Sequence, residues 1–123
     1  MYIRNEDTIY APATVPGTGA ISIIRISGPD ALSIPDKVVS CRRSSISSAK
    51  GYTRKFGTIC YMSGEIVDEV IASVFRAPHS YTGEDSVEIS CHASSYIVSA
   101  VMQLLSEAGA RAAEPGEFTQ RAF

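Results

Sequence analysis

Short segments with β-strand patterns lie next to one another in this chain, and only one long helix interrupts them. Strands are expected over residues 7–13, 20–27, 52–61, 66–75 and 86–91, which are rich in β-branched residues or alternate apolar with polar side chains. Strands that follow one another without an intervening helix are typical of an α+β fold rather than of a doubly wound sheet. The sequence therefore predicts an α+β fold with a mixed or antiparallel sheet and two to three helices.

The clearest helix is expected to begin at Ser94 or Ser95 and to run through Ala108. Within it, Ile97 and Val101 belong to an apolar stripe that repeats at helical spacing. Serine is a favoured residue at the start of a helix, because its hydroxyl accepts a hydrogen bond from a free backbone N–H group.

The remaining segments supply turns and connectors. Residues 31–39 predict a short helix that Pro35 kinks or ends, and residues 40–51 predict a polar connector. Residues 110–114 predict a last short strand. The pair Pro115-Gly116 then has the residue order of a type II turn.

Composition places the chain among globular proteins with one domain. Its 123 residues, 45% of them hydrophobic and 20% charged, fit a single core. A net charge of -2 disfavours direct binding to a nucleic-acid backbone. The N-terminus carries acids where a signal peptide carries a basic and then an apolar segment, and no apolar run reaches membrane-spanning length. We expect a cytoplasmic protein without membrane contact.

The cysteines and histidines show no disulfide or metal-binding pattern. Cys41, Cys60 and Cys91 are odd in number and lack CxxC spacing, which argues against a disulfide framework and structural zinc. Cys91 beside His92 suggests a thiolate activated by imidazole, but neighbouring strand residues point to opposite faces, so a buried structural thiol is favoured. His79 and His92 are not spaced as metal ligands, and no metal is expected.

The sequence contains no loop suited to nucleotide phosphates. Gly17-Thr18-Gly19 resembles the start of a dinucleotide fingerprint, but Ser22 stands at the third glycine position, and the loop leads into a strand rather than a helix. A GxxxxGK[ST] motif is absent as well. The segment is therefore not expected to hold a nucleotide by itself.

Two charged residues on predicted strands are candidate ligand contacts. Arg25 lies on a strand that is apolar almost throughout, so its guanidinium needs a partner. That partner is an acid of this chain, water, or an anion or carbonyl of a ligand. Glu88 shares a polar strand face with Ser86 and Ser90. It is either solvated or accepts two parallel hydrogen bonds from the N–H edge of a flat heterocycle such as a pterin.

Two stretches with many charges, aromatic rings and turn residues indicate a site. They are residues 80–85 (Ser-Tyr-Thr-Gly-Glu-Asp) and residues 114–123 (Glu-Pro-Gly-Glu-Phe-Thr-Gln-Arg-Ala-Phe). The second stretch ends where a helix is expected to begin, which predicts that the chain is the first domain of a longer protein. Ion pairs or loop caps that fix the turns are expected for the charged members of both stretches, Glu84, Asp85, Glu117 and Arg121.

Five motifs, in order and at natural spacing, resemble one known family. They are residues 7–14 (Asp-Thr-Ile-Tyr-Ala-Pro-Ala-Thr), 23–29 (Ile-Ile-Arg-Ile-Ser-Gly-Pro), 80–85, the pair Cys91-His92, and 115–123. Together they extend over nearly the whole chain. They resemble the N-terminal domain of the tRNA modification GTPase family, MnmE/TrmE.

The resemblance implies a folate-binding and dimerisation domain over residues 1–123, similar in fold to the folate-binding domain of the glycine-cleavage aminomethyltransferase. The implied cofactor is 5-formyltetrahydrofolate or a related reduced folate, and the implied assembly is a homodimer. Full-length members add a helical domain and a GTPase domain, which uses GTP, potassium and magnesium. With a flavoprotein partner they modify the wobble uridine of certain tRNAs. These residues hold none of that later machinery, so this segment is not expected to catalyse a reaction alone.

The resemblance also assigns residues, position by position. The family's folate-contacting arginine falls on Arg25, and its contacting glutamate falls on Glu88. A third family contact, a lysine, lies beyond Phe123.

The sequence departs from the family pattern at two places. Thr18 and Ala20 stand in a run that is often rich in glycine, and Ala93 and Ser94 stand where the family often has Gly-Gly. The added Cβ atoms are expected to narrow the approach of a ligand to the backbone. Two alternatives therefore stay open: a stand-alone folate-dependent transferase, and a structural dimerisation module that binds no folate.

Overall fold

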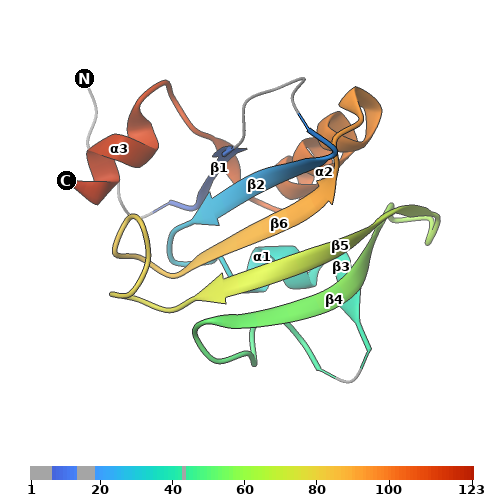
Figure 1. The fold of residues 1–123 in the computed structure, drawn as a ribbon, viewed down its shortest axis with the longest axis horizontal. Coiled ribbons are helices and arrows are strands. Elements are labelled where there is room, and N and C mark those ends of the chain that lie inside the picture. The colour runs from blue at the N-terminus through green and yellow to red at the C-terminus, as the bar shows by residue number, and fades with distance from the viewer. Residues whose placement is uncertain (1–6, 14–18, 43) are drawn as a thin grey trace.

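A computed structural model describes residues 7–13, 19–42 and 44–123, which form one seven-stranded sheet and three helices (Figure 1). Across the sheet the strand order is β3-β4-β5-β6-β2-β1-β7; β1 and β7 pair in parallel and the other neighbours pair antiparallel. The predicted α+β class with a mixed sheet is confirmed. The strands are β1 (Ile9–Pro12), β2 (Ile21–Ser27), β3 (Val39–Cys41), β4 (Thr53–Cys60), β5 (Ile66–Phe75), β6 (Ser86–His92) and β7 (Arg111–Ala112), and the helices are α1 (Ser33–Asp36), α2 (Ser95–Glu107) and α3 (Glu117–Ala122).

One face of the sheet forms the core. Helices α1 and α2 lie against this face, behind the sheet in the view of Figure 1. Burial of each large aliphatic side chain stabilises the fold by about 1.5–3 kcal/mol. The strands contribute alternate residues and α2 contributes its apolar stripe; the buried members are Ile24, Ile26, Val70, Ala72, Val74, Val87, Ile89, Cys91, Ala100, Val101, Leu104 and Leu105.

The predictions for residues 31–51 are partly wrong. The expected helix is confined to Ser33–Asp36, and Val39–Cys41 of the expected helix end and polar connector form the edge strand β3. A helix that began at Ala31 would need an N–H group at Pro35, which proline lacks, so Pro35 accounts for the late start of the helix. Gly57 of the partner strand β4 allows the close approach, since a Cβ atom there would lie 2.7 Å from the carbonyl oxygen of Ser40.

The helix that was clearest in the sequence is confirmed, together with its ends. Ser94 has extended dihedrals and its hydroxyl accepts a hydrogen bond of 3.3 Å from the N–H group of Ile97. Gly109 follows the helix with a φ of 121°, the left-handed region that favours glycine. The departure at Ser94 from the family pattern thus provides a helix cap. Within the described ranges, no helix is both long and apolar enough to cross a membrane.

The predicted turn before α3 is also confirmed. Gly116 has a φ of 81°, and the N–H group of Glu117 donates to the carbonyl oxygen of Glu114 at 2.9 Å. These are the features of a type II turn with Pro115 and Gly116 in the middle. The turn places α3 beside the loop between β5 and β6 (Figure 1).

The other face of the sheet, here called the open face, is not covered by α1 or α2. Cross-strand register places Arg54, Ser73, Glu88 and Arg25 in one row and Phe56, Ile71, Ser90 and Ile23 in the next. Phe56 is 77% exposed, and Ile21 at the start of β2 is 51% exposed. This face therefore combines polar residues with large apolar side chains in contact with solvent.

Candidate functional site

Arg25 and Glu88 face each other across the centre of the open face. They are register partners on β2 and β6, and the Nε atom of Arg25 donates to Oε2 of Glu88 at 2.9 Å. About a quarter of each side chain is exposed, 26% for Arg25 and 24% for Glu88. The structure thus brings the two predicted site residues together. The partner that Arg25 requires is an acid of this chain, and that acid is Glu88.

The contact uses only part of each side chain. Among the described residues, the hydrogen bonds reach one oxygen of Glu88 and only the Nε atom of Arg25. The second carboxylate oxygen and both terminal nitrogens of the guanidinium remain able to bind a ligand. A carboxylate oxygen accepts, and the guanidinium donates, so the pair presents both kinds of hydrogen-bonding group side by side.

Two aromatic rings flank the guanidinium of Arg25. Its Cζ atom lies 4.8 Å from the ring centre of Tyr81 and 6.0 Å from that of Phe118. Tyr81 belongs to the predicted stretch 80–85 and Phe118 to the stretch 114–123, so the two stretches meet at Arg25. Both rings are within the range of a cation–π interaction. The sequence marks the stretches, but it does not single out these two rings.

Two hollows adjoin the Arg25–Glu88 pair. The Arg25 hollow, of about 300 Å³, lies between the end of β1 and residues 113–119. The Glu88 hollow, of about 490 Å³, lies over β2, β4, β5 and β6, with Ile23 and Ile71 in its lining. The ion pair therefore stands at the boundary between two spaces, one of which Phe118 helps to line.

A cluster of hydroxyl groups holds the loop that carries Tyr81. The buried Ser27 hydroxyl lies 2.5 Å from the Thr82 hydroxyl, donates to Oε1 of Glu84 at 3.0 Å, and accepts from the Ser86 hydroxyl at 3.1 Å. The cluster joins β2 and β6 to the loop. It fixes the position of the Tyr81 ring relative to Arg25.

A network of ion pairs holds α3 beside the same loop. Glu117, 2% exposed, accepts two hydrogen bonds from the guanidinium of Arg111, at 2.6 and 3.1 Å. Arg121 contacts Glu84 at 3.3 Å and Asp7 at 2.6 Å. The predicted ion pairs of Glu84, Glu117 and Arg121 are confirmed. The network fixes the helix that carries Phe118.

Asp85 serves as the predicted cap of its loop. Its Oδ1 atom accepts a hydrogen bond of 2.8 Å from the N–H group of Ala77. Because Ala77 begins the same loop, this contact closes the segment between β5 and β6. The loop is thereby tied at both ends and presents Tyr81 in a defined position.

A second polar arrangement lies at the far end of β6. The Nδ1 atom of His92 lies 2.9 Å from Oδ1 and 3.1 Å from Oδ2 of Asp68, and the backbone N–H of His92 donates to Oδ2 at 2.8 Å. Burial raises the pKa of Asp68, but hydrogen bonds from the backbone and ring of His92 and from the backbone of Glu69 outweigh burial and hold it below its ordinary value. The carboxylate is therefore charged at neutral pH.

The sequence interpretation missed Asp68. A signal for it exists, because strand alternation places Asp68 on the same side as the buried residues Val70, Ala72 and Val74. A carboxylate on an apolar side requires donors, which His92 provides.

Cys91 is a buried structural thiol, as the sequence indicates. Its side chain is 2% exposed and belongs to the core, whereas His92 is exposed. Burial, and then the charge of Asp68, raise the pKa of Cys91 to about 11. The thiol is therefore protonated at neutral pH and not a nucleophile.

Some interpretations fall on residues that the structure does not describe. These are the acidic N-terminus over residues 1–6, and Gly17 and Thr18 of the glycine loop. The departure at Thr18 lies in the same region. At the other departure, the N–H group of Ala93 donates to the carbonyl oxygen of Ala20 at 2.9 Å, so both residues hold the ends of β2 and β6 together.

Comparison with known proteins gives consistent matches over nearly the whole chain. The family model described as the GTP-binding protein TrmE N-terminus matches residues 8–123. A protein of Bacteroides thetaiotaomicron named tRNA modification GTPase MnmE is 56% identical over 121 residues, covering 97% of this chain and 26% of the relative. A protein of the same name from Moorella thermoacetica is 52% identical over 120 residues, covering 96% of this chain and 26% of the relative. The chain thus spans about a quarter of the length of these relatives.

Proposed function

Because the chain belongs to the family described as the GTP-binding protein TrmE N-terminus, we propose that it is the folate-binding and dimerisation domain of a tRNA modification GTPase. Its part is to hold a reduced folate such as 5-formyltetrahydrofolate. GTP hydrolysis, with its potassium and magnesium, and the contacts with tRNA and a flavoprotein partner belong to other regions of the full-length protein. The proposed location is the cytoplasm.

The Arg25–Glu88 pair is the observation that carries this proposal. The free oxygen of Glu88 is suited to accept hydrogen bonds from the amino-pyrimidinone edge of a pterin, and the terminal nitrogens of Arg25 are suited to donate to its carbonyl oxygen. Tyr81 and Phe118 provide flat apolar surfaces beside the guanidinium. Hollows on both sides of the pair supply room for an extended ligand.

The test is the binding of 5-formyltetrahydrofolate to the wild-type chain and to Glu88→Gln. Ligand at about 100 times its Kd stabilises a protein by about 2.7 kcal/mol, so the melting temperature of the wild type rises. Loss of a charge-assisted hydrogen bond weakens binding by roughly 10- to 100-fold, which titration calorimetry measures directly.

The control is Glu65→Gln, in the exposed turn between β4 and β5. It should bind folate as the wild type does. Equal affinity in Glu88→Gln and wild type rejects Glu88 as the pterin contact, and no binding to the wild type rejects the folate proposal altogether.

A dimerisation module without folate is the second candidate. The observation that favours it is the ion pair itself, because Arg25 and Glu88 already satisfy each other's charge without a ligand. Under this candidate the chain sediments as a dimer, and calorimetry detects no heat with 5-formyltetrahydrofolate.

A further inference from the structure

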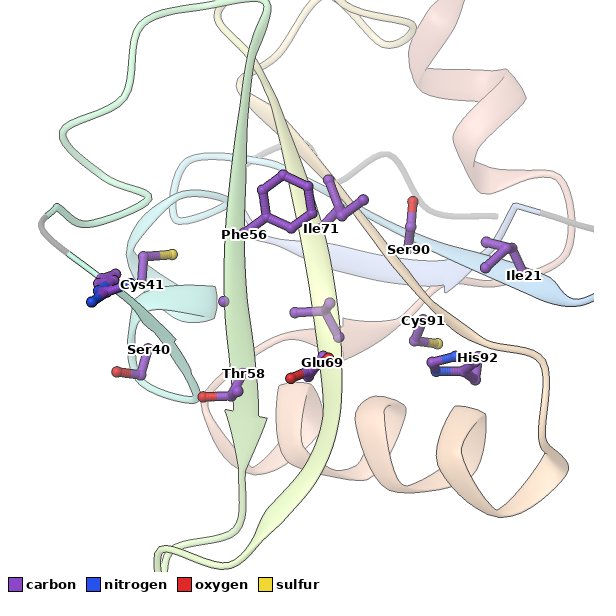
Figure 2. Close-up of a pocket in the computed structure, with 13 residues that line it drawn as sticks. Ile21, Ser40, Cys41, Phe56, Thr58, Glu69, Ile71, Ser90, Cys91 and His92 are labelled. Carbon is purple, nitrogen blue, oxygen red and sulfur yellow. The ribbon is translucent and has the colours of Figure 1, made fainter.

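A third hollow, the His92 hollow, lies on the open face away from Arg25. It has a volume of about 650 Å³ and extends from β3 across β4 and β5 to the end of β6 (Figure 2). It shares Ile21, Ile71 and Ser90 with the Glu88 hollow, but neither Arg25 nor Glu88 lines it. It therefore adjoins the Glu88 hollow on the same face but lies outside the Arg25–Glu88 pair.

The floor of the His92 hollow is apolar and broad. Figure 2 shows Phe56, Ile71 and Ile21 spread across β4, β5 and β2, with their side chains on the same side of the sheet. An aromatic ring and two branched aliphatic side chains form a surface on which a flat ring can lie. The floor thus offers a planar ligand a surface for stacking.

His92 is held in one tautomer at the edge of this floor. Because the Asp68 carboxylate only accepts hydrogen bonds, the ring proton of neutral His92 lies on Nδ1, 2.9 Å from Oδ1. Nε2 then carries the lone pair. Among the described residues no hydrogen bond reaches Nε2, and the side chain is 66% exposed. His92 lines the hollow, so this acceptor stands at its edge.

The charged residues around the hollow define the complementary ligand. Glu69 of β5 lines the hollow on the strand next to His92, so two acceptors stand at one side. Arg42, directly after β3, lines the opposite side and can donate to a carbonyl group or an anion. A ligand that matches has N–H donors on one edge and an acceptor on the other.

We propose that the His92 hollow is a second binding site, which takes a flat nitrogen heterocycle whose N–H edge donates to Nε2 of neutral His92. Asp68 is the positioning residue that fixes the tautomer. The site is additional to the proposed folate site. The groups that face the imidazole are Asp68 and Glu69 of β5, Arg42 across the hollow, and the neutral Cys91 thiol of its own strand. Protonation of the ring turns Nε2 into a donor, so the heterocycle binds only the neutral form.

The test uses 2-aminopurine, a fluorescent flat heterocycle with N–H groups, titrated into the full chain. Nitrogen NMR of the two histidines first establishes the tautomer of His92 and the pH range in which its ring titrates. Binding of 2-aminopurine is expected above that range and should weaken at least about tenfold below it. Below it, the hydrogen bond to Nε2 is lost, and the N–H group of the ligand faces the N–H group of the protonated ring.

Matched variants separate the role of His92 from general effects on folding. His92→Ala should lose the binding, whereas His79→Ala, which removes the only other histidine, should retain both the affinity and its pH dependence. Asp68→Asn should retain the fold by circular dichroism and lose the Nδ1–H tautomer in the NMR spectrum. Glu65→Gln, in the exposed turn between β4 and β5, should bind 2-aminopurine as the wild type does. A wild type saturated with 5-formyltetrahydrofolate should bind 2-aminopurine with unchanged affinity, so failure of the folate proposal is distinguishable from failure here.

Three outcomes overturn the proposal. They are no binding of 2-aminopurine to the wild type above the titration range, binding that is equally strong in folded His92→Ala, and binding that is independent of pH or stronger when His92 is protonated.

Discussion

Asp7 joins the start of the described chain to two arginines near its end. Its carboxylate lies 2.5 Å from Nε of Arg111 and 2.6 Å from Nη2 of Arg121. The hydrogen bond from Arg111 is the main reason that the pKa of Asp7 is lowered from 3.8 to about 2; burial opposes it, and Arg121 adds to it. A folded pKa below the unfolded value stabilises the fold fully above pH 3.8, and this contribution is lost as the pH falls through about 2.

We expect Asp7→Asn to destabilise the fold in a manner that depends on pH. At about pH 7 the free energy of unfolding should fall by about 1 kcal/mol, because solvent screens a side chain that is one-third exposed. The difference from the wild type should shrink below pH 3.8 and disappear as the pH falls below about 2. Urea unfolding across this range measures it. A difference that stays constant with pH would show that the carboxylate charge is not responsible.

At the scale of the element, the start of α2 depends on one hydroxyl. Ser94 Oγ accepts from the N–H group of Ile97, one of the groups that has no partner within the helix. This helix packs its apolar stripe on the sheet, so fraying at its first turn also loosens the end of the core beside β6.

Ser94→Ala should lower the free energy of unfolding by about 1 kcal/mol, and Ser94→Gly by only a few tenths, because glycine leaves the N–H groups open to water. Chemical denaturation followed by circular dichroism measures both. Ser99→Ala, an exposed position inside α2, is the control and should cost nothing, because alanine is the better helix former. Equal losses at both serines would contradict a capping role for Ser94.

Elements with a clear period were predictable from the sequence, and elements defined by distant contacts were not. α2 and the β4–β5 hairpin carry their pattern within one segment. β3 has only three residues and forms a strand because it pairs with β4, which is why the expectation of a helix end at Val39 and a polar connector from residue 40 is wrong there.

For the candidate site, the residue types were predictable and the pairing was not. Arg25 and Glu88 are both identifiable on their own strands. Their contact depends on the register between β2 and β6, which no local pattern specifies. The contact between Asp68 and His92 likewise joins residues from two strands at the point where pairing of β5 and β6 has ended.

At the scale of the whole molecule, the open face is the surface that we propose as the binding site of a second copy. Phe56 is 77% exposed and Ile21 51% exposed; both line the His92 hollow, and Ile21 also lines the Glu88 hollow. Large exposed apolar side chains on one face are typical of association surfaces. We propose that the homodimer forms across this face, where a second copy would cover hollows that a single copy leaves open to solvent.

Phe56→Asp should therefore weaken dimerisation by roughly 100-fold, since an unpaired charge in the interface costs about 3 kcal/mol. Sedimentation equilibrium measures the dissociation constant. The matched control is Met62→Asp, at a residue that is 98% exposed in the β4–β5 turn, away from the strands of the open face. A monomeric wild type, or equal weakening by both variants, would contradict pairing across this face.

The parallel contact between β1 and β7 brings residues 113–119 to the side of the Arg25 hollow. During synthesis the ribosome releases Arg25 long before residues 113–119. For that interval β2 is present but the residues that complete the Arg25 hollow are not. Under the proposed function, a folate that contacts both sides of this hollow can bind only after residues 113–119 have left the ribosome. If the chain binds folate as proposed, loading follows the synthesis of residues 113–119, and the folate does not take part in the earlier steps of folding.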